Sequence, residues 1–318
     1  MAMLRTRRTK IGNWYEDSCL EEDVLKEYLE KKERGELAVQ KVALLKEHIL
    51  KPVSLSVSTD GGVHFGDTVM LVNLGGPSRE CSAVSMNADV SSLTREAFLG
   101  ISAPCEVSAG RDMQPRARTS FTITSVDGSS DGSRLHYEQS FALKTLCGFT
   151  RGLFLTSDIC SFQKCTKKSR LQEVSLETDG SFLSWWRVVH FDPQERLEHE
   201  GLPVPVNAKV LIVHCKTNHA LAVLGDHSLW TMYGKEYELA AHTFLDSHKV
   251  EEEKNHWWMC TSDPGEEGQQ QFDTEQQREC IHRCAGALSF SSRSECGHSM
   301  WALKMALTSI KSDLLLPV

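Results

Sequence analysis

A tryptophan pair followed by Asp-Pro occurs twice in the sequence, as SWWRVVHFDP at 184–193 and as HWWMCTSDP at 256–264. A short aromatic and β-branched run predicts a strand. The Asp-Pro behind it predicts the end of that strand, because proline has no N–H for the ladder and aspartate favours turns. With the pairs superimposed, Trp186 corresponds to Trp258, 72 residues further on. Such a recurrence indicates a repeated structural unit.

Two other features recur in the same order along the chain. One is a strand entered from a polar turn, and with Val69, Phe141 and Val210 as equivalents its copies are 72 and 69 residues apart. The other is an apolar strand that ends in aspartate, and its copies end at Asp89, Asp158 and Asp226. The stretch SFTITSVDG at 120–128 occupies the place of the first closing strand. Several landmarks with nearly one spacing predict a threefold repeat.

Lobes of about 70 residues predict a mainly β fold, a three-lobed β-trefoil, because a few short strands cannot bury their apolar face without closing around a shared axis. The side chains expected inside the barrel are Val69, Leu71, Phe141, Leu143, Val210 and Ile212. In each tryptophan pair, alternation sends one indole to the core and the other to the lobe surface, where its N–H meets an acceptor. The pair is interpreted as a lobe-closing device, with a ligand-stacking platform as the alternative.

The N-terminal part predicts a basic arm over 1–19, with a transit peptide as the alternative reading. Ser18 and Glu21 have the spacing of a capping box, and Gly35 is placed to end the helix that follows. The apolar stripe of this helix consists of Leu20, Val24, Leu25, Tyr28 and Leu29. A second helix carries Ala38, Val42, Leu45 and Ile49 on one side and ends at Pro52.

The resulting domain plan has four parts. We expect the arm over 1–19, a short α-helical hairpin over 20–52, the trefoil core over 53–264 and a divergent, partly disordered tail over 265–318. The tail has a stripe at helical spacing that predicts a C-terminal helix, formed by Met300, Leu303, Leu307, Ile310 and Leu314.

Composition narrows the class of protein. A net charge of −8 argues against a nucleic-acid-binding surface, which needs a basic face. Eleven cysteines without a secretory signal favour reduced thiols, and no apolar run reaches the roughly 18 residues of a membrane span. We therefore expect an intracellular, soluble protein that binds neither nucleic acid nor membrane.

The candidate chemical groups favour no enzyme. The tail group Cys280, Cys284, Cys296 and His298, with His282 nearby, offers soft zinc ligands but lacks the usual paired short spacing. His242, His248 and His256 fall in one lobe without an accompanying HExxH pattern. His214 and Cys215 are adjacent on a strand and so point to opposite faces, which excludes a dyad. We expect no catalytic centre, no cofactor and no metal, with a zinc-stabilised adaptor as a minor alternative.

Several longer stretches resemble the cilia- and flagella-associated protein 161 family. They are KIGNWYED at 10–17, LEEDVLKEYLEKKERG at 20–35, HFGDTVMLVN at 64–73, LQEVSL at 171–176, FDPQERLEHEGLPVPVNAKVLI at 191–212 and YGKEYELAAHTFLDSHKVEEEKNHWW at 233–258. The resemblance spans roughly residues 10–264 and ends beyond Pro264. The lobes are also similar to the MIR-type trefoil repeat.

The resemblance implies a structural microtubule inner protein of motile cilia. Such a protein lies in the cytoskeleton, on the lumenal wall of the A-tubule of axonemal doublet microtubules near the seam, with tubulin and other lumenal proteins as partners. The family's anchoring segment maps onto Ile11, Gly12, Asn13 and Trp14. To these we add the basic residues that would suit the acidic surface of tubulin, which are Arg5, Arg7, Arg8 and Lys10.

The alternative function is a carbohydrate- or phosphoinositide-binding trefoil module of the endoplasmic reticulum. Trefoil lectins place aromatic residues and a carboxylate in each lobe, and Trp185, Trp257 and Asp226 are the candidates here. The absence of an Asn-x-Ser/Thr glycosylation triplet counts against this compartment.

Overall fold

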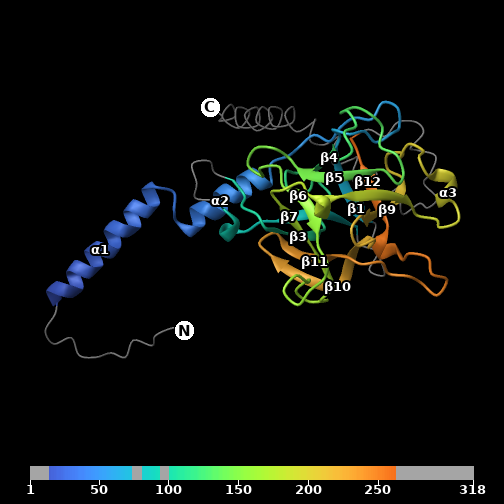
Figure 1. Cartoon of the computed structure of the whole chain (residues 1–318). Coiled ribbons are helices and arrows are strands. Elements are labelled where there is room, and N and C mark those ends of the chain that lie inside the picture. The colour runs from blue at the N-terminus through green and yellow to red at the C-terminus, as the bar shows by residue number, and fades with distance from the viewer. Residues whose placement is uncertain (1–13, 74–80, 94–99, 263–318) are drawn as a thin grey trace, which may run out of the picture. The chain divides into compact units, whose positions relative to one another are not determined.

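The computed structural model describes residues 14–73, 81–93 and 100–262. The chain divides into two compact units, one up to Glu47 and the other from His48 onward. Each unit is built by a different periodicity of its sequence, helical in the first and alternating in the second (Figure 1). No helix among the described residues is both long and apolar enough to cross a bilayer.

The first unit is helical. It contains α1 (Trp14–Glu33) and most of α2 (Ala38–Ile49). α1 begins inside the predicted arm, so the capping box predicted at Ser18 is wrong; the acidic first turn, with Glu16 and Asp17, suits the helix N-terminus instead. Gly35 ends α1 as predicted, because its positive φ of 71° permits the two bonds of a Schellman cap. In this cap Gly35 N donates to the Lys32 carbonyl and Glu36 N to the Lys31 carbonyl.

The apolar stripe of α1 is exposed, whereas the predicted helical hairpin would bury it against the second helix. Its five residues, Leu20, Val24, Leu25, Tyr28 and Leu29, keep between 45% and 65% of their surface. The apolar residues of the stripe are flanked by many charges, which let α1 stay solvated and form ion pairs along its own surface. One such pair joins Lys31 Nζ to Glu27 Oε1 at 2.5 Å.

The second unit contains 12 strands, each linked by antiparallel pairing. The strands are β1 (Thr68–Asn73), β2 (Ser82–Asn87), β3 (Cys105–Gly110), β4 (Phe121–Ser125), β5 (Ser140–Thr145), β6 (Phe154–Ser157), β7 (Gln172–Glu177), β8 (Trp186–His190), β9 (Lys209–His214), β10 (Leu221–Thr231), β11 (Gly234–Ala241) and β12 (Trp257–Cys260). Short helices interrupt them at η1 (Val90–Ser92), η2 (Phe182–Ser184), α3 (Arg196–His199) and η3 (Glu253–Asn255).

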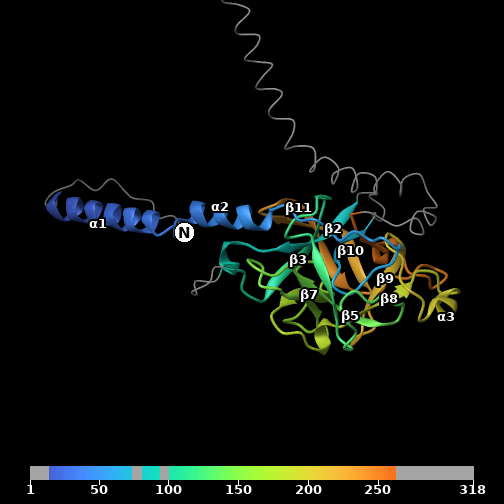
Figure 2. The same cartoon turned by 90° about the horizontal axis from the view of Figure 1, so that it is seen from above.

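The strand pairing forms a β-trefoil, as the sequence predicted. β1, β4, β5, β8, β9 and β12 pair in that order and β12 returns to β1, which closes a six-stranded barrel. β2, β6 and β10 each pair with the next strand of the chain, in three hairpins. The second strands of these hairpins, β3, β7 and β11, pair with one another and form a triangular cap (Figures 1 and 2).

The barrel interior follows the predicted alternation. All six side chains expected inside, Val69, Leu71, Phe141, Leu143, Val210 and Ile212, are buried. The first strand of each lobe faces a large aromatic residue of a closing strand, in the pairs Val69 with Phe121, Phe141 with Trp186 and Val210 with Trp257. These three aromatic residues contribute much of the stability of the core, since the burial of each removes a large apolar area from water.

The register corrects the sequence alignment by one residue, because Trp186 is equivalent to Trp257 and not to Trp258. The 3-10 helix before each closing strand ends in a C-cap residue, Trp185 in the second lobe and His256 in the third. The residue after that cap enters the barrel. Since the repeated motif is two identical residues, sliding one copy by a single position still matches a tryptophan, which is why the sequence did not reveal the shift.

The two barrel tryptophans also make equivalent hydrogen bonds. Trp186 Nε1 donates to the Leu155 carbonyl at 2.9 Å, and Trp257 Nε1 donates to the Leu221 carbonyl at 2.9 Å. The acceptors lie on β6 and β10, the second strands of the respective lobes. The sequence predicted an acceptor for the surface indole; the structure shows that the buried indole also uses its N–H, which ties the barrel to the hairpin.

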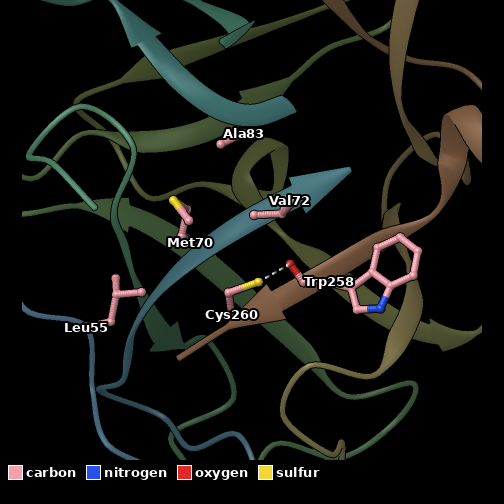
Figure 3. Close-up of a cluster of buried hydrophobic side chains, with 6 residues drawn as sticks. All are labelled: Leu55, Met70, Val72, Ala83, Trp258 and Cys260. Carbon is pink, nitrogen blue, oxygen red and sulfur yellow. Dashed lines mark hydrogen bonds between the residues drawn. The ribbon is translucent and has the colours of Figure 1, made fainter. Parts of the chain in front are cut away.

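Trp258 is buried as well, on the outer side of the barrel wall. It belongs to a cluster of buried side chains that consists of Leu55, Met70, Val72, Ala83, Trp258 and Cys260 (Figure 3). Within it, Cys260 Sγ lies 4.0 Å from the Trp258 carbonyl oxygen. The segment before β1 therefore covers the outer face of β1 and β12 and encloses a second apolar layer.

Candidate partner-binding surfaces

The predicted tubulin-binding residues lie almost wholly outside the described residues. Arg5, Arg7, Arg8, Lys10, Ile11, Gly12 and Asn13 fall before Trp14, where α1 begins. Their role stays a prediction. The tail candidates for zinc, Cys280, Cys284, Cys296 and His298, and the predicted C-terminal helix also lie outside the described residues.

The exposed stripe of α1 is a candidate partner-binding surface that follows directly on this segment. Its side chains are Leu20, Val24, Leu25, Tyr28 and Leu29, and Tyr15 in the first turn is exposed as well. A helix with apolar residues at these intervals and charges elsewhere can lie in an apolar groove of another protein. The sequence predicts this stripe from its helical spacing, which alone does not say whether the stripe is buried or exposed.

A cavity of about 550 Å³ opens where the triangular cap meets the second lobe. Its wall carries five carboxylates and one ammonium group, from Glu106, Asp158, Glu173, Glu177, Asp179 and Lys164. Burial raises the pKa of Glu173, and the neighbouring Glu106 raises it further. Hydrogen bonds from Lys216 and Lys164 hold the pKa of Asp158 below its usual range. The cavity therefore has an acidic wall that disfavours anionic ligands.

Cys105 lines the same cavity and supplies a thiol to its wall. Burial raises the pKa of the Cys105 thiol to about 12, and the Glu106 carboxylate adds to this. A thiol with so high a pKa stays protonated at neutral pH and is a poor nucleophile. The cavity geometry thus supplies no activated nucleophile at this position.

The sequence-predicted histidine and cysteine candidates serve in packing. His214 lies in the core, with Nδ1 2.9 Å from Thr217 Oγ1 and Nε2 2.9 Å from the Leu183 carbonyl. Cys215 instead has its Sγ 3.7 Å from Ser140 Oγ, so the two adjacent residues have different partners. His242 lies against Phe244, whereas His256 lies against Phe191, so these two histidines have separate surroundings.

Most cysteines of the described residues are outside disulfides. These are Cys19, Cys105, Cys147, Cys160, Cys165, Cys215 and Cys260. Cys81 is disulfide-bonded, which corrects the expectation of a reduced thiol at that position.

The residues proposed for a lectin-like site do not form one. Trp257 is buried and its N–H is bonded to the Leu221 carbonyl, so it offers no face for sugar stacking. Trp185 packs edge to face on Phe182 with ring centroids 5.1 Å apart. Asp226 is exposed at the bulge of β10, with its carboxylate 3.9 Å from Lys254 Nζ. The register shift explains the difference, because Trp185 and Trp257 are not equivalent positions of their lobes.

Comparisons with known proteins cover most of this chain. Residues 41–262 match the cilia- and flagella-associated protein 161-like domain. The Danio rerio cilia- and flagella-associated protein 161 is 54% identical over 286 residues, which cover 87% of this chain and 95% of the relative. The chain belongs to this family.

The relatives of the cilia- and flagella-associated protein 161 family extend to mammals. The Bos taurus protein is 42% identical over 81% of this chain and 82% of its own length. The Mus musculus protein is 42% identical over 80% of this chain and 87% of its own length. Membership confirms the resemblance found in the sequence and points to cilia and flagella as the place of this chain.

Two solved structures are similar to the trefoil part. The SDF2-like protein from Arabidopsis thaliana has a TM-score of 0.46 and 14% identity, over 63% of this chain and 94% of that chain. A Caenorhabditis elegans protein described as having unknown function has a TM-score of 0.47 and 14% identity, over 64% of this chain and 98% of that chain. The fold assignment itself rests on the strand pairing.

Proposed function

We propose that the chain is a structural microtubule inner protein, bound to the lumenal wall of the A-tubule of doublet microtubules near the seam, in the axoneme of motile cilia. The main support for this proposal is that residues 41–262 match a family named for cilia and flagella. The closed trefoil supports it, because a barrel whose strands all have partners is a rigid body suited to a scaffold. No reaction is part of this role.

The proposed mechanism is adhesion by many modest contacts. The basic segment before Trp14 is suited to the acidic surface of tubulin, and the apolar stripe of α1 offers a second contact with tubulin or with another lumenal protein. Repetition along a lattice lets weak individual contacts add up, since each bound copy holds further groups at high local concentration. Because the whole chain has a net charge of −8, we expect electrostatic attraction to the acidic surface of tubulin at the basic segment and not over the rest of the protein.

Localisation and protection together test the lumenal position. The tagged full chain is expressed in multiciliated cells that lack their own copy, and immunogold label is scored on cross-sections of axonemes. We expect label inside the A-tubule, and protection of the chain from added protease in intact doublets but not in doublets opened by sonication. Label on the outer wall, or digestion in intact doublets, would refute the lumenal position.

Microtubule co-sedimentation tests the attachment residues. Deletion of residues 1–15 and the neutral variant with Arg5, Arg7, Arg8 and Lys10 replaced by Gln are compared with the full chain. We expect both variants to bind at least about tenfold more weakly, with a reduced dependence on salt, because exposed charge contacts are screened by ions. As a matched control, Lys26, Lys31 and Lys32 of α1 are replaced by Gln, and this variant is expected to sediment like the full chain. Unchanged binding of both N-terminal variants would show that attachment lies elsewhere.

A second pair of variants tests the stripe of α1. Leu20 and Val24 are replaced by Ser, and the control replaces the charged neighbours Glu21 and Glu22 by Gln. Because the stripe is exposed, the first variant is expected to fold normally and to lose binding, whereas the control keeps it. Equal binding by the two would remove the stripe from the proposed contact.

A further inference from the structure

Two histidines and a glutamate meet at the end of β8. His190 is the last residue of β8 and is buried, and Glu195 stands directly before α3. His199 ends α3, four residues after Glu195, so both side chains lie on one face of this turn. The potential ligand atoms of the three residues all lie within 4.8 Å of one another, and His190 Nε2 is 3.7 Å from Glu195 Oε2. Figure 2 shows α3 beside β8, at one edge of the barrel.

Each histidine has a backbone carbonyl beside its other ring nitrogen. His199 Nδ1 lies 3.0 Å from the Glu195 carbonyl oxygen, to which an Nδ1–H can donate. His190 Nδ1 accepts from the Asp192 backbone N–H at an N···N distance of 3.3 Å and lies 3.5 Å from the Asp192 carbonyl oxygen, so zinc at its Nε2 requires a change to the tautomer that gives up the first bond and donates to the carbonyl. When the proton is on Nδ1 and is donated to the carbonyl, Nε2 is left with a free lone pair. This is the arrangement that metal-binding histidines adopt, with one nitrogen on the metal and the other donating to a carbonyl.

The two imidazoles are stacked, with centroids 4.0 Å apart and planes 9° from parallel. Two imidazolium cations would repel at this distance, so the stack requires at least one neutral ring. Neutral imidazole is the form that binds metal. Tyr137 closes the apolar side of the pair, with its ring edge-on to both histidines.

We propose that His190, Glu195 and His199 bind a divalent zinc ion that joins α3 to the end of β8. Two imidazoles and one carboxylate are a ligand set that zinc uses, with water in the fourth position. Bonds of about 2.0–2.2 Å to a tetrahedral ion bring ligand atoms to roughly 3.3 Å from one another. Because the nitrogen lone pairs lie in the ring planes, the two imidazoles must also turn out of their parallel stack to point at one ion. The Glu195 side chain is 52% exposed, which gives the ion a path from solvent.

The surrounding contacts fix the backbone of this site. Arg196 Nε donates to the His190 carbonyl at 3.0 Å, and its Nη2 donates to Glu251 Oε2 at 2.7 Å. These bonds hold the start of α3 against β8 before any ion binds, so that zinc meets ligands already brought together. The expectation from sequence that the chain has no metal site missed this group, because the stretch HFDPQERLEH has none of the familiar ligand spacings.

Zinc titration of the purified full chain, freed of metal beforehand, tests the site by calorimetry and by thermal unfolding. The wild-type chain is expected to bind one equivalent here and to gain melting temperature, since an ion that binds only the folded state stabilises it. His199→Ala and Glu195→Gln are expected to weaken this binding by more than about 100-fold, because losing even an outer partner of a ligand costs 10–100-fold. Glu198→Gln on the same turn and His248→Ala are the matched controls and should bind like wild type.

Cobalt(II) substitution separates this site from cysteine ligands elsewhere in the chain. Nitrogen and oxygen ligands give a spectrum without the strong sulfur-to-cobalt charge-transfer bands that thiolates produce. We expect one equivalent of cobalt without these bands, lost in His199→Ala and kept in Glu198→Gln. If wild type and His199→Ala bind the same number of equivalents with the same affinity, or if wild type binds only through thiolates, the proposal is wrong.

Discussion

The closing strands of the second and third lobes, β8 and β12, hold the same tryptophan pair in different ways. In both lobes the residue after the 3-10 cap is the barrel tryptophan, Trp186 or Trp257. In the second lobe the other tryptophan, Trp185, comes just before β8 and is partly exposed, whereas in the third lobe the other tryptophan follows within β12 and is buried. Because successive residues of a strand point to opposite faces, one step of register gives the same dipeptide two roles. Position relative to the cap, and not residue type, decides which indole builds the core.

The largest expected effect comes from removing either barrel tryptophan. Trp186→Ala and Trp257→Ala should each lower the free energy of unfolding by about 3–5 kcal/mol, because each empties a large buried volume. Denaturant unfolding measures the loss. The conservative variants Trp186→Phe and Trp257→Phe are the controls, since the first lobe has Phe121 at this position; they should cost roughly 1–3 kcal/mol, in part for the lost indole bond. A large loss at one position and a small one at the other would break the equivalence.

The second tryptophans should differ from each other. Trp258→Ala is expected to cost about 3 kcal/mol, because the indole packs with Leu55, Met70 and Val72 in the outer cluster. Trp185→Ala should cost less than about 1 kcal/mol, since its site is partly exposed and can take up water. The same unfolding experiment compares them. Equal costs would mean that the outer layer over β12 contributes no more than the surface of β8.

The last residue of each 3-10 helix sharpens the comparison. Asn255 Nδ2 donates to the carbonyls of Leu221 and His242, at 3.1 and 2.8 Å, and Asn255 Oδ1 accepts from Phe244 N. Ser184 occupies the same place in the second lobe and donates to the Ser181 carbonyl alone. Asn255→Ala should therefore cost about 2–3 kcal/mol and Ser184→Ala about 1 kcal/mol or less, because the first leaves several buried groups unpaired. A cost for Asn255→Ala no larger than that for Ser184→Ala would show that water replaces the lost bonds.

The trefoil could be predicted from sequence because its repeat is written in alternating apolar residues. Val69, Phe141 and Val210 were aligned correctly, since each is the second residue of a strand of the same pattern after a polar turn. The closing strands could be found but not aligned, because the cap that sets their register is a hydrogen-bonded turn without a shared sequence: it is FLS in one lobe and EKN in the other.

The surfaces were less predictable than the core. An apolar stripe such as that of α1 has the same spacing whether it packs within the chain or stays exposed, so periodicity alone does not give its environment. The group of His190, Glu195 and His199 could not be inferred from spacing either. It depends on α3 turning back beside the end of β8, and the Arg196 bond to the His190 carbonyl that fixes this turn is a tertiary contact.

The smallest expected effect is a pH dependence that distinguishes the two cap residues, His256 and Trp185. Burial lowers the pKa of His256 to about 4, and the nearby Lys209 ammonium contributes. The unfolded chain therefore binds a proton that the folded chain does not, between pH of about 6.5 and about 4. The stability of the folded state is complete above this range and falls as the pH drops through it.

Between pH 7 and 5, His256 should account for a loss of about 1–2 kcal/mol, since each proton contributes about 1.4 kcal/mol per pH unit. The free energy of unfolding of His256→Gln, measured at both pH values, should fall by that much less than the free energy of unfolding of the wild type. The other buried histidines, His190 and His214, contribute the same pH dependence in both proteins and cancel in the comparison. In the second lobe, Trp185→His should add no comparable dependence, because that position is partly exposed and a histidine there can be protonated in the folded state. If Trp185→His loses as much stability in acid as His256 accounts for, the two caps share one environment and burial does not distinguish them.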